Sequence, residues 1–209
     1  MPASGHMKGR GRLARVKIVG GAWRGRSIQV PEGRGVTRPT MDRTRESMAS
    51  MVLSAFGLDL SGVRALDAFA GSGAIGFELL SRGALACTFV DRDAAALRCV
   101  RSNAEALGAK PPRVTVARGD ALALARRGRV PGGPFSLVVL DPPYAVAAES
   151  VSGLVRDLGA AGLLRDGAVI LYERSADAPD LDVDGAELVS ERGRGITAVS
   201  LWRLGGSHE

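Results

Sequence analysis

Short apolar runs alternate with longer amphipathic segments from Val63 onward. The runs have the length of strands, whereas the segments between them repeat their apolar residues at helical spacing. The expected strands are residues 64–68, 86–90, 113–117, 135–140 and 168–173, and the expected helices are residues 74–81, 93–107, 121–126 and 149–158. Gly108 follows the longest helix, where a left-handed glycine would cap it. This repetition predicts an α/β fold, with a parallel sheet covered by helices on both faces.

The alternation of strands and helices does not continue at either end of the chain. Residues 187–192 and 196–203 are strand-like and flank Gly193-Arg194-Gly195, which predicts an antiparallel C-terminal hairpin. Near the N-terminus, the β-branched residues 16–19 and 27–30 flank a glycine-rich connection and predict a second hairpin. Thr40 is the expected N-cap of a helix that continues to about residue 56.

Length and hydropathy bound the class of protein. At 209 residues and 45% hydrophobic content, the chain can bury one sizeable core. No apolar run approaches the roughly 20 residues of a membrane span, and the N-terminus lacks a signal-peptide pattern, so we expect a soluble, cytoplasmic protein with no membrane partner. Cys87 and Cys99 lie in apolar stretches without metal-ligand spacing, which predicts buried thiols and no metal site.

The basic residues are concentrated at the N-terminus. The net charge is +6, and residues 1–60 hold 11 Lys and Arg against 4 Asp and Glu, whereas the remainder holds 17 against 18. A concentrated basic patch favours a polyanionic partner. A solvated basic tail, or arginine usage set by genome composition, is the alternative. We expect a flexible basic tail over residues 1–15, a hairpin and helix extension over 16–60, and the main domain over 61–205.

A glycine-rich loop follows the first strand of the main domain. Gly71-Ser72-Gly73-Ala-Ile-Gly76 matches G-x-G-x-x-G, and Asp91 stands 20 residues after Gly71, where an acid can bind a ribose. An NAD(P)-dependent oxidoreductase fits this pattern. Asp67, however, places a carboxylate beside the loop, which suits the ammonium group of S-adenosylmethionine better than a pyrophosphate.

Further along the chain, Asp120 follows the third strand, where an acid can read the exocyclic amine of adenine. A helix N-cap is the alternative for Asp120, and packing beneath the loop is the alternative for Phe69. The expected cofactor-binding residues are Asp67, Phe69, Gly71, Ser72, Gly73, Gly76, Asp91, Arg92, Asp120 and Ala121.

A second motif, Asp141-Pro142-Pro143-Tyr144, follows the fourth strand at the edge where open α/β sheets bind ligands. An exocyclic amine on a base is a poor nucleophile, because its lone pair is delocalised into the ring. The Asp141 carboxylate and the Pro142 carbonyl can accept its hydrogens and aim the lone pair at a methyl group, while the prolines fix the backbone. Tyr144 can stack on an extruded base. A proline turn that caps the strand, with a packing role for Tyr144, is the alternative.

The chain resembles the bacterial 16S ribosomal RNA guanine-N2 methyltransferases called RsmD, over residues 16–204. The most specific matches are Ile18-Val-Gly-Gly-Ala-Trp-Arg-Gly-Arg26 and Arg38-Pro-Thr-Met-Asp-Arg-Thr-Arg-Glu46. The resemblance implies a Rossmann-like seven-stranded class I methyltransferase sheet, mostly parallel with a C-terminal antiparallel hairpin, plus the N-terminal β-hairpin and helix. It also implies S-adenosylmethionine as the cofactor, S-adenosylhomocysteine as the product, and 16S rRNA, in the small ribosomal subunit or its assembly intermediate, as the partner. The large size of this substrate favours a monomer.

The same resemblance implies roles for the N-terminal residues. Arg24 and Arg26 would grip RNA phosphates, and the pocket entrance would be lined by Arg38, Thr40, Arg43 and Arg45. A charged helix start with internal pairing is the alternative for residues 43–46. Ala49-Ser50 stands where family members commonly have Phe-Asn. An amino-methyltransferase for tRNA or DNA, and a non-catalytic ribosome assembly factor, are the other hypotheses.

Overall fold

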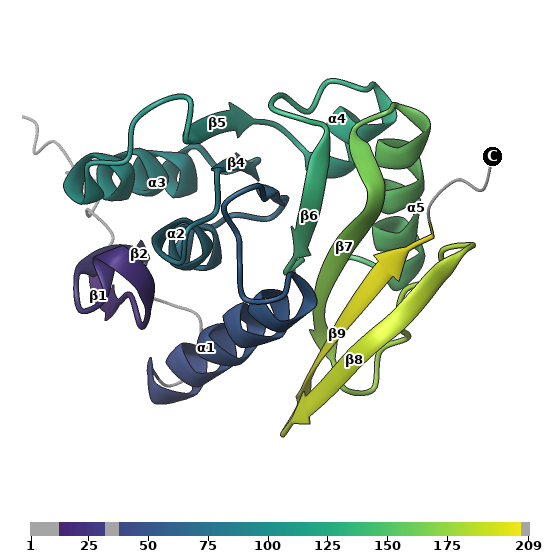
Figure 1. Ribbon diagram of the computed structural model, residues 1–209, viewed down its shortest axis with the longest axis horizontal. Coiled ribbons are helices and arrows are strands. Elements are labelled where there is room, and N and C mark those ends of the chain that lie inside the picture. The colour runs from purple at the N-terminus through teal and green to yellow at the C-terminus, as the bar shows by residue number, and fades with distance from the viewer. Residues whose placement is uncertain (1–12, 32–37, 206–209) are drawn as a thin grey trace, which may run out of the picture.

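The computed structural model describes residues 13–31 and 38–205, with their side chains except at 13, 31, 38–42 and 194. Its centre is a seven-stranded sheet of order β5-β4-β3-β6-β7-β9-β8 (Figure 1). The strands are β3 Arg64–Asp67, β4 Ala86–Asp91, β5 Val114–Arg118, β6 Phe135–Leu140, β7 Leu164–Ser175, β8 Ala186–Arg194 and β9 Thr197–Leu204. The first five run parallel, and β9 is antiparallel to both β7 and β8. The predicted sheet and its C-terminal hairpin are confirmed.

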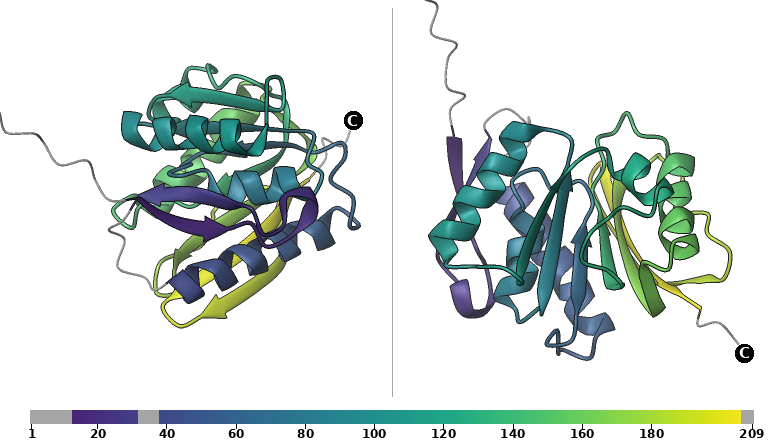
Figure 2. Two further views of the ribbon diagram at one scale, coloured as in Figure 1. Left: turned by 90° about the vertical axis from the view of Figure 1, so that its left-hand side faces the viewer. Right: turned by 90° about the horizontal axis from the view of Figure 1, so that it is seen from above.

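Helices cover both faces of the sheet, as Figure 2 shows. They are α1 Arg38–Ala55, α2 Ala74–Ser81, α3 Ala94–Leu107, α4 Ala121–Arg126 and α5 Ala148–Ala160. Side chains along each strand point alternately to the two faces of the sheet, so the hydrophobic core consists of two clusters, one on each face. In β6, Leu137 and Val139 pack in the cluster that contains α1, α2 and α3 residues, whereas Val138 and Leu140 pack in the cluster that contains α4 and α5 residues. No helix in the described ranges is both long and apolar enough to cross a membrane.

Local sequence signals set several boundaries. Asp93 caps α3 by accepting the Ala95 N–H at 2.7 Å, and Gly108 ends it with a φ of 71°, as expected. The loop between β8 and β9 is one residue later than predicted, because Arg194 still pairs with Thr197 and leaves a two-residue turn that begins at Gly195, whose φ is 60°. Cys87 and Cys99 are buried free thiols.

Helix α1 and strand β7 are longer than the sequence predicted. Helix α1 begins at Arg38 rather than at Thr40, because Pro39 is compatible with a first helical turn. Strand β7 extends through residues 164–175 rather than 168–173, since β9 pairs with it as far as Ser175. The predicted tail over residues 1–15 lies mostly outside the described residues.

The N-terminal hairpin packs against α2 and α3. It consists of β1 Leu13–Lys17, a 3₁₀ turn at Gly21–Trp23 and β2 Ser27–Pro31. Asn103 of α3 pairs with the backbone of Gln29 in both directions, at 2.7 and 2.9 Å. Gly21 has a φ of 76°, and a Cβ there would lie 1.9 Å from the Ser81 carbonyl oxygen. Only glycine therefore permits this approach between the hairpin and α2.

A buried carboxylate on α2 joins the hairpin to α1. Glu78 is fully buried and accepts the N–H groups of Val19 and Gly20 at 2.9 and 2.8 Å. Arg82 forms an ion pair with it at 2.9 Å, and the Arg45 Nε of α1 lies 3.7 Å away. A buried charge is stable only when it is paired and hydrogen-bonded. Glu78 accepts hydrogen bonds from the hairpin backbone and from Arg82, and the Arg45 guanidinium of α1 is a second cation beside it.

We expect Glu78→Gln to lower the free energy of unfolding by about 3 kcal/mol, because the neutral amide leaves the buried guanidinium of Arg45 and the half-buried guanidinium of Arg82 without their counter-charge. Urea unfolding followed by circular dichroism would measure this change. Glu149→Gln is the matched control: it removes an exposed ion pair with Arg156 and should change stability by less than about 1 kcal/mol. Equal effects of the two substitutions would contradict the role given to Glu78.

Candidate active site

The glycine-rich loop joins β3 to α2 at the carboxyl edge of the sheet. Gly71 and Gly73 have φ values of 53° and 77°, a conformation that L side chains rarely adopt. At Gly76 a Cβ would lie 2.3 Å from the ring of Phe89. The first two glycines therefore shape the loop, and Gly76 lets α2 pack closely on β4.

Asp91, at the end of β4, holds this loop in place. One of its carboxylate oxygens accepts the Gly71 N–H and the other accepts the Asp93 N–H, both at 2.8 Å. Each oxygen has a second lone pair that can accept from a ligand. Arg92 is exposed beside it, and the carbonyl of the half-buried Ser72 accepts a hydrogen bond from Asn103 at 3.1 Å. The loop is thus fixed from both β4 and α3.

Asp67 is a buried acid with spare hydrogen-bonding capacity. Its side chain is 1% exposed, and its Oδ2 has no hydrogen-bond partner among the described residues. Burial, and then the charge of Asp141, raise the pKa of Asp67 to about 8. A buried carboxylate in this state is stabilised by a cation placed beside it. The residue therefore fits an ammonium group bound at the loop.

The end of β5 supplies the third predicted acid. Asp120 accepts the Ala123 N–H at 3.0 Å and so caps α4, which was the alternative considered for it. Its side chain is exposed, so the cap leaves it accessible to a ligand. Ala121 is buried behind it, and the half-buried Phe69 packs against the core cluster on the α4 side.

The Asp-Pro-Pro-Tyr loop leaves β6 at the same edge. Asp141 is half-buried and Pro142 is buried, whereas Pro143 and Tyr144 are exposed. The Val146 N–H donates to the Pro143 carbonyl at 2.9 Å, which closes a turn. Tyr144 is 70% exposed, so its ring is available for stacking on a planar ligand. Since Asp141 influences the pKa of Asp67, the fold brings the two motifs together.

Sequence reasoning missed a further acid, Glu173 in β7. It is half-buried, and burial together with the charge of Asp141 raises its pKa to about 8. The pairing of Leu140 with Tyr172 places Asp141 and Glu173 at adjacent positions of neighbouring strands. Its position as the last residue of a predicted strand was the available signal. Among the described residues, no group of three acidic, histidine or cysteine side chains could hold a metal ion.

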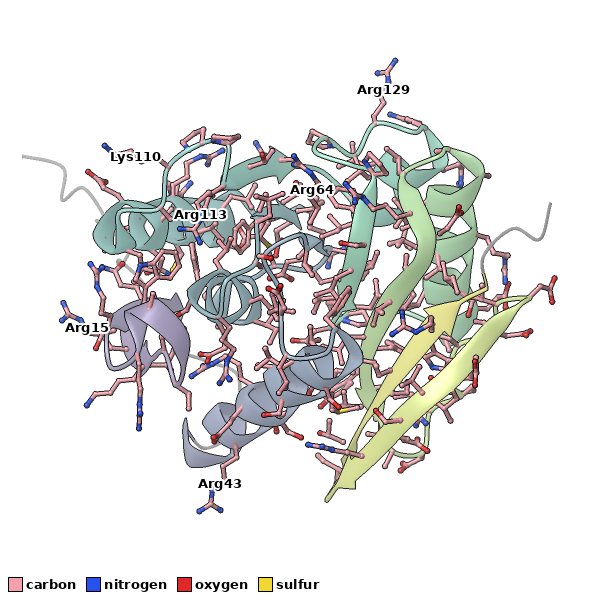
Figure 3. All side chains as sticks on the ribbon, in the orientation of Figure 1. Arg15, Arg43, Arg64, Lys110, Arg113 and Arg129 are labelled. Atoms are coloured by element: carbon pink, nitrogen blue, oxygen red, sulfur yellow. The ribbon has the colours of Figure 1, made fainter. Side chains whose placement is uncertain are left out.

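The predicted RNA-binding residues divide into exposed and structural side chains. Arg24 is exposed, and Arg43 points away from α1 into solvent (Figure 3). Arg26 is exposed as well, but its guanidinium donates to the carbonyls of Ala106 and Leu107 at the end of α3. Arg45 is 8% exposed and donates to the Lys17 carbonyl at 2.6 Å. The side chains of Arg38 and Thr40 lie outside the described part of the chain.

Comparisons with known proteins place the chain in a family. The family described as conserved hypothetical protein 95 matches residues 16–203. The Haemophilus influenzae protein named ribosomal RNA small subunit methyltransferase D is 30% identical over 191 residues, which cover 90% of this chain and 93% of that protein. The Escherichia coli protein of the same name is 34% identical over 163 residues, covering 78% and 76% of the two chains.

A solved structure supports the same assignment. The Escherichia coli protein described as putative methyltransferase yhhF superimposes with a TM-score of 0.75 and 26% identity, covering 92% of this chain and 99% of that one. The similarity therefore includes the N-terminal hairpin and α1 as well as the sheet. This chain belongs to the RsmD family of ribosomal RNA methyltransferases.

Proposed function

We propose that the protein transfers a methyl group from S-adenosylmethionine to the exocyclic N2 of one guanine in 16S rRNA, in the small ribosomal subunit or its assembly intermediate. The observation that carries the proposal is the convergence of Asp67 and the Asp141-Pro142 loop at one edge of the sheet. The relatives' names support a ribosomal RNA substrate. Family membership also favours a methyltransferase over the NAD(P)-dependent oxidoreductase that the glycine loop alone allowed.

The residues at the glycine loop fit the cofactor. Asp67 offers a buried carboxylate oxygen for the ammonium group, and Asp91 offers lone pairs for the ribose hydroxyls. Gly71 and Gly73 have no Cβ atoms, so the ligand can approach the backbone at these two positions. When bound, S-adenosylmethionine supplies an electrophilic methyl group on a sulfonium.

The Asp-Pro-Pro-Tyr loop prepares the acceptor nitrogen. The Asp141 carboxylate and the Pro142 carbonyl accept the two N2 hydrogens, which holds the nitrogen lone pair out of conjugation with the ring. Tyr144 stacks on the base that leaves the RNA helix. The lone pair forms the new N–C bond as the S–C bond breaks, and one N2 proton passes to Asp141 or to water. Both acceptors are held by a turn with two fixed proline φ angles.

The proposed reaction is tested by digesting rRNA to nucleosides after incubation of small subunits with the protein and labelled cofactor. Mass spectrometry should find N2-methylguanosine at one position. Parallel incubations with tRNA and DNA distinguish the other amino-methyltransferase hypotheses. A non-catalytic assembly factor would be indicated if wild type bound small subunits without methylating them and if substitution of Arg24 and Arg26 abolished that binding.

We expect Asp141→Ala to lower the rate of methyl transfer by at least about 100-fold, because the N2 nitrogen loses an acceptor that acts at the reacting centre. Binding of S-adenosylhomocysteine, measured by calorimetry, should stay nearly unchanged. Asp157→Ala, an acid on α5, is the matched control and should retain the wild-type rate. Full activity of Asp141→Ala would refute the role given to this loop.

The raised pKa of Asp67 predicts proton release when the cofactor binds. With a pKa of about 8 the free protein holds a proton on Asp67 at pH 7, and an ammonium group beside the carboxylate favours its ionised form. We expect S-adenosylhomocysteine binding at pH 7 to release about one proton, and its affinity to rise as the pH increases from about 6 to 7. Calorimetry in two buffers of different ionisation enthalpy measures the proton count. The same release from Asp67→Asn would contradict this assignment.

The exposed arginines near the N-terminus predict salt-dependent binding to RNA. Arg15 on β1 and Arg43 on α1 both point into solvent, whereas Arg129 does so at the opposite end of the molecule (Figure 3). We expect Arg15→Ala and Arg43→Ala each to weaken binding to small subunits and to reduce the slope of log affinity against log salt by about one. Arg129→Ala serves as the control. A slope unchanged in all three variants would place the RNA elsewhere.

A further inference from the structure

Three acids lie in a row where three neighbouring strands end. Asp67 ends β3, Asp141 follows β6 and Glu173 lies near the end of β7, and these strands are adjacent in the sheet. Side-chain alternation places all three on the face covered by α1, because Ala65, Val139 and Leu171 pack in the cluster on that face. The charge of Asp141 raises the pKa of both other acids. Asp141 therefore has an acid on each side.

A cavity of about 400 Å³ lies between α1 and the β8–β9 hairpin. Glu173 pairs with Val199 of β9, and cross-strand partners project from the same face of a sheet. Val199 lines the cavity together with Thr44, Ser47, Arg192, Gly193 and Thr197. The cavity thus lies between α1 and the β8–β9 hairpin, at the carboxyl end of β7. Its volume is within the range of small-molecule sites.

The lining of the cavity suits a nucleotide. Arg192 donates to the Ser47 hydroxyl at 3.2 Å, which holds its guanidinium group between β8 and α1. A guanidinium flanked by hydroxyl groups is suited to phosphate and ribose oxygens. On the other side, the row of acids offers hydrogen-bond acceptors to the donors of a base. One nucleotide can therefore meet donors at the cavity and acceptors at the sheet edge.

The donor pattern of guanine leaves one hydrogen for Glu173. In the proposed function, Asp141 and Pro142 accept both hydrogens on N2. The N1–H group stands next to N2 on the same edge of the base, and a buried donor without an acceptor is costly. Glu173, adjacent to Asp141, is the acid placed to accept it. Adenine has a lone pair instead of a hydrogen at N1, so the same position favours guanine.

We propose that Glu173 is a specificity-determining residue whose carboxyl group accepts the N1–H of the target guanine, while that nucleotide occupies the cavity between α1 and the β8–β9 hairpin. This inference rests on the proposed function and deepens it. It assigns the choice of base to β7 rather than to the Asp-Pro-Pro-Tyr loop, which needs only an exocyclic amine. Arg192 would hold the phosphate of the same nucleotide.

The test compares two small subunits assembled from 16S rRNA that carries either guanine or 2-aminopurine at the methylated position. 2-Aminopurine keeps the exocyclic amine but lacks the N1 hydrogen. We expect wild type to methylate guanine at least 10-fold faster in single turnover, because one buried hydrogen bond is lost with the analogue. Glu173→Ala should reduce this preference to near unity, mainly by slowing transfer to guanine.

Two further variants separate recognition from folding. Glu173→Gln keeps a carbonyl that can accept N1–H and should retain most of the preference, whereas Glu187→Ala, an exposed acid on β8, should leave both rates unchanged. Ser47→Trp fills the cavity and should raise the subunit concentration needed for half-maximal rate at least 10-fold. Binding of S-adenosylhomocysteine reports the folded fraction of each variant.

A ratio of guanine to 2-aminopurine rates that is the same in Glu173→Ala as in wild type would overturn the inference, since a purely structural loss slows both substrates equally. Failure of the proposed function has a different signature, because wild type would then produce no methylated guanosine from either particle.

Discussion

The buried carboxylate of Glu78 attaches the N-terminal hairpin and α1 to the main domain. Glu78 lies in α2, the helix that follows the glycine loop. It accepts hydrogen bonds from the hairpin backbone and from Arg82, and Arg45 of α1 forms an ion pair with it. A charge in the core tolerates little displacement of its partners, because an unpaired buried ion is far less stable than a paired one. The loop proposed to hold the cofactor is therefore fixed to the N-terminal extension, which Arg26 and Asn103 also join to α3.

This attachment determines what covers the carboxyl edge of the sheet. Ser47 of α1 contacts Arg192 of β8, and the Ala55 carbonyl at the end of the helix accepts from Arg203 of β9. Helix α1 thus lies along the C-terminal strands, with Thr44 and Ser47 lining the cavity beside the β8–β9 hairpin. The charge of Asp141 raises the pKa of Asp67 and of Glu173, an unfavourable arrangement that a ligand rich in donors relieves. The proposed site therefore combines acids of the sheet with residues of α1, which are distant from one another in the sequence.

Much of this arrangement could be predicted from the sequence, because its signals are local. Strand and helix alternation, the Asp93 cap and the glycine cap at Gly108 depend on residues close in the chain, and the structure confirms them. Glu173 was missed because its partner, Asp141, is distant in sequence and adjacent only through strand register. The contact between Arg45 and Glu78 depends in the same way on how α1 packs on α2. Periodicity identifies a buried face, but it does not identify what lies opposite that face.

The number of basic residues in the N-terminal segment does not equal the number available to bind RNA. Net charge counts every arginine equally, whereas two of them have partners within the protein: the exposed Arg26 donates to carbonyls at the end of α3, and Arg45 is buried against Glu78. Arg15, Arg24 and Arg43 remain exposed. Only exposed cations can release counterions from RNA, so the excess of 11 basic over 4 acidic residues in this segment overstates the surface available for a polyanion. Arg26 and Arg45, which bond within the protein, position the hairpin and the helix that carry the exposed Arg15, Arg24 and Arg43.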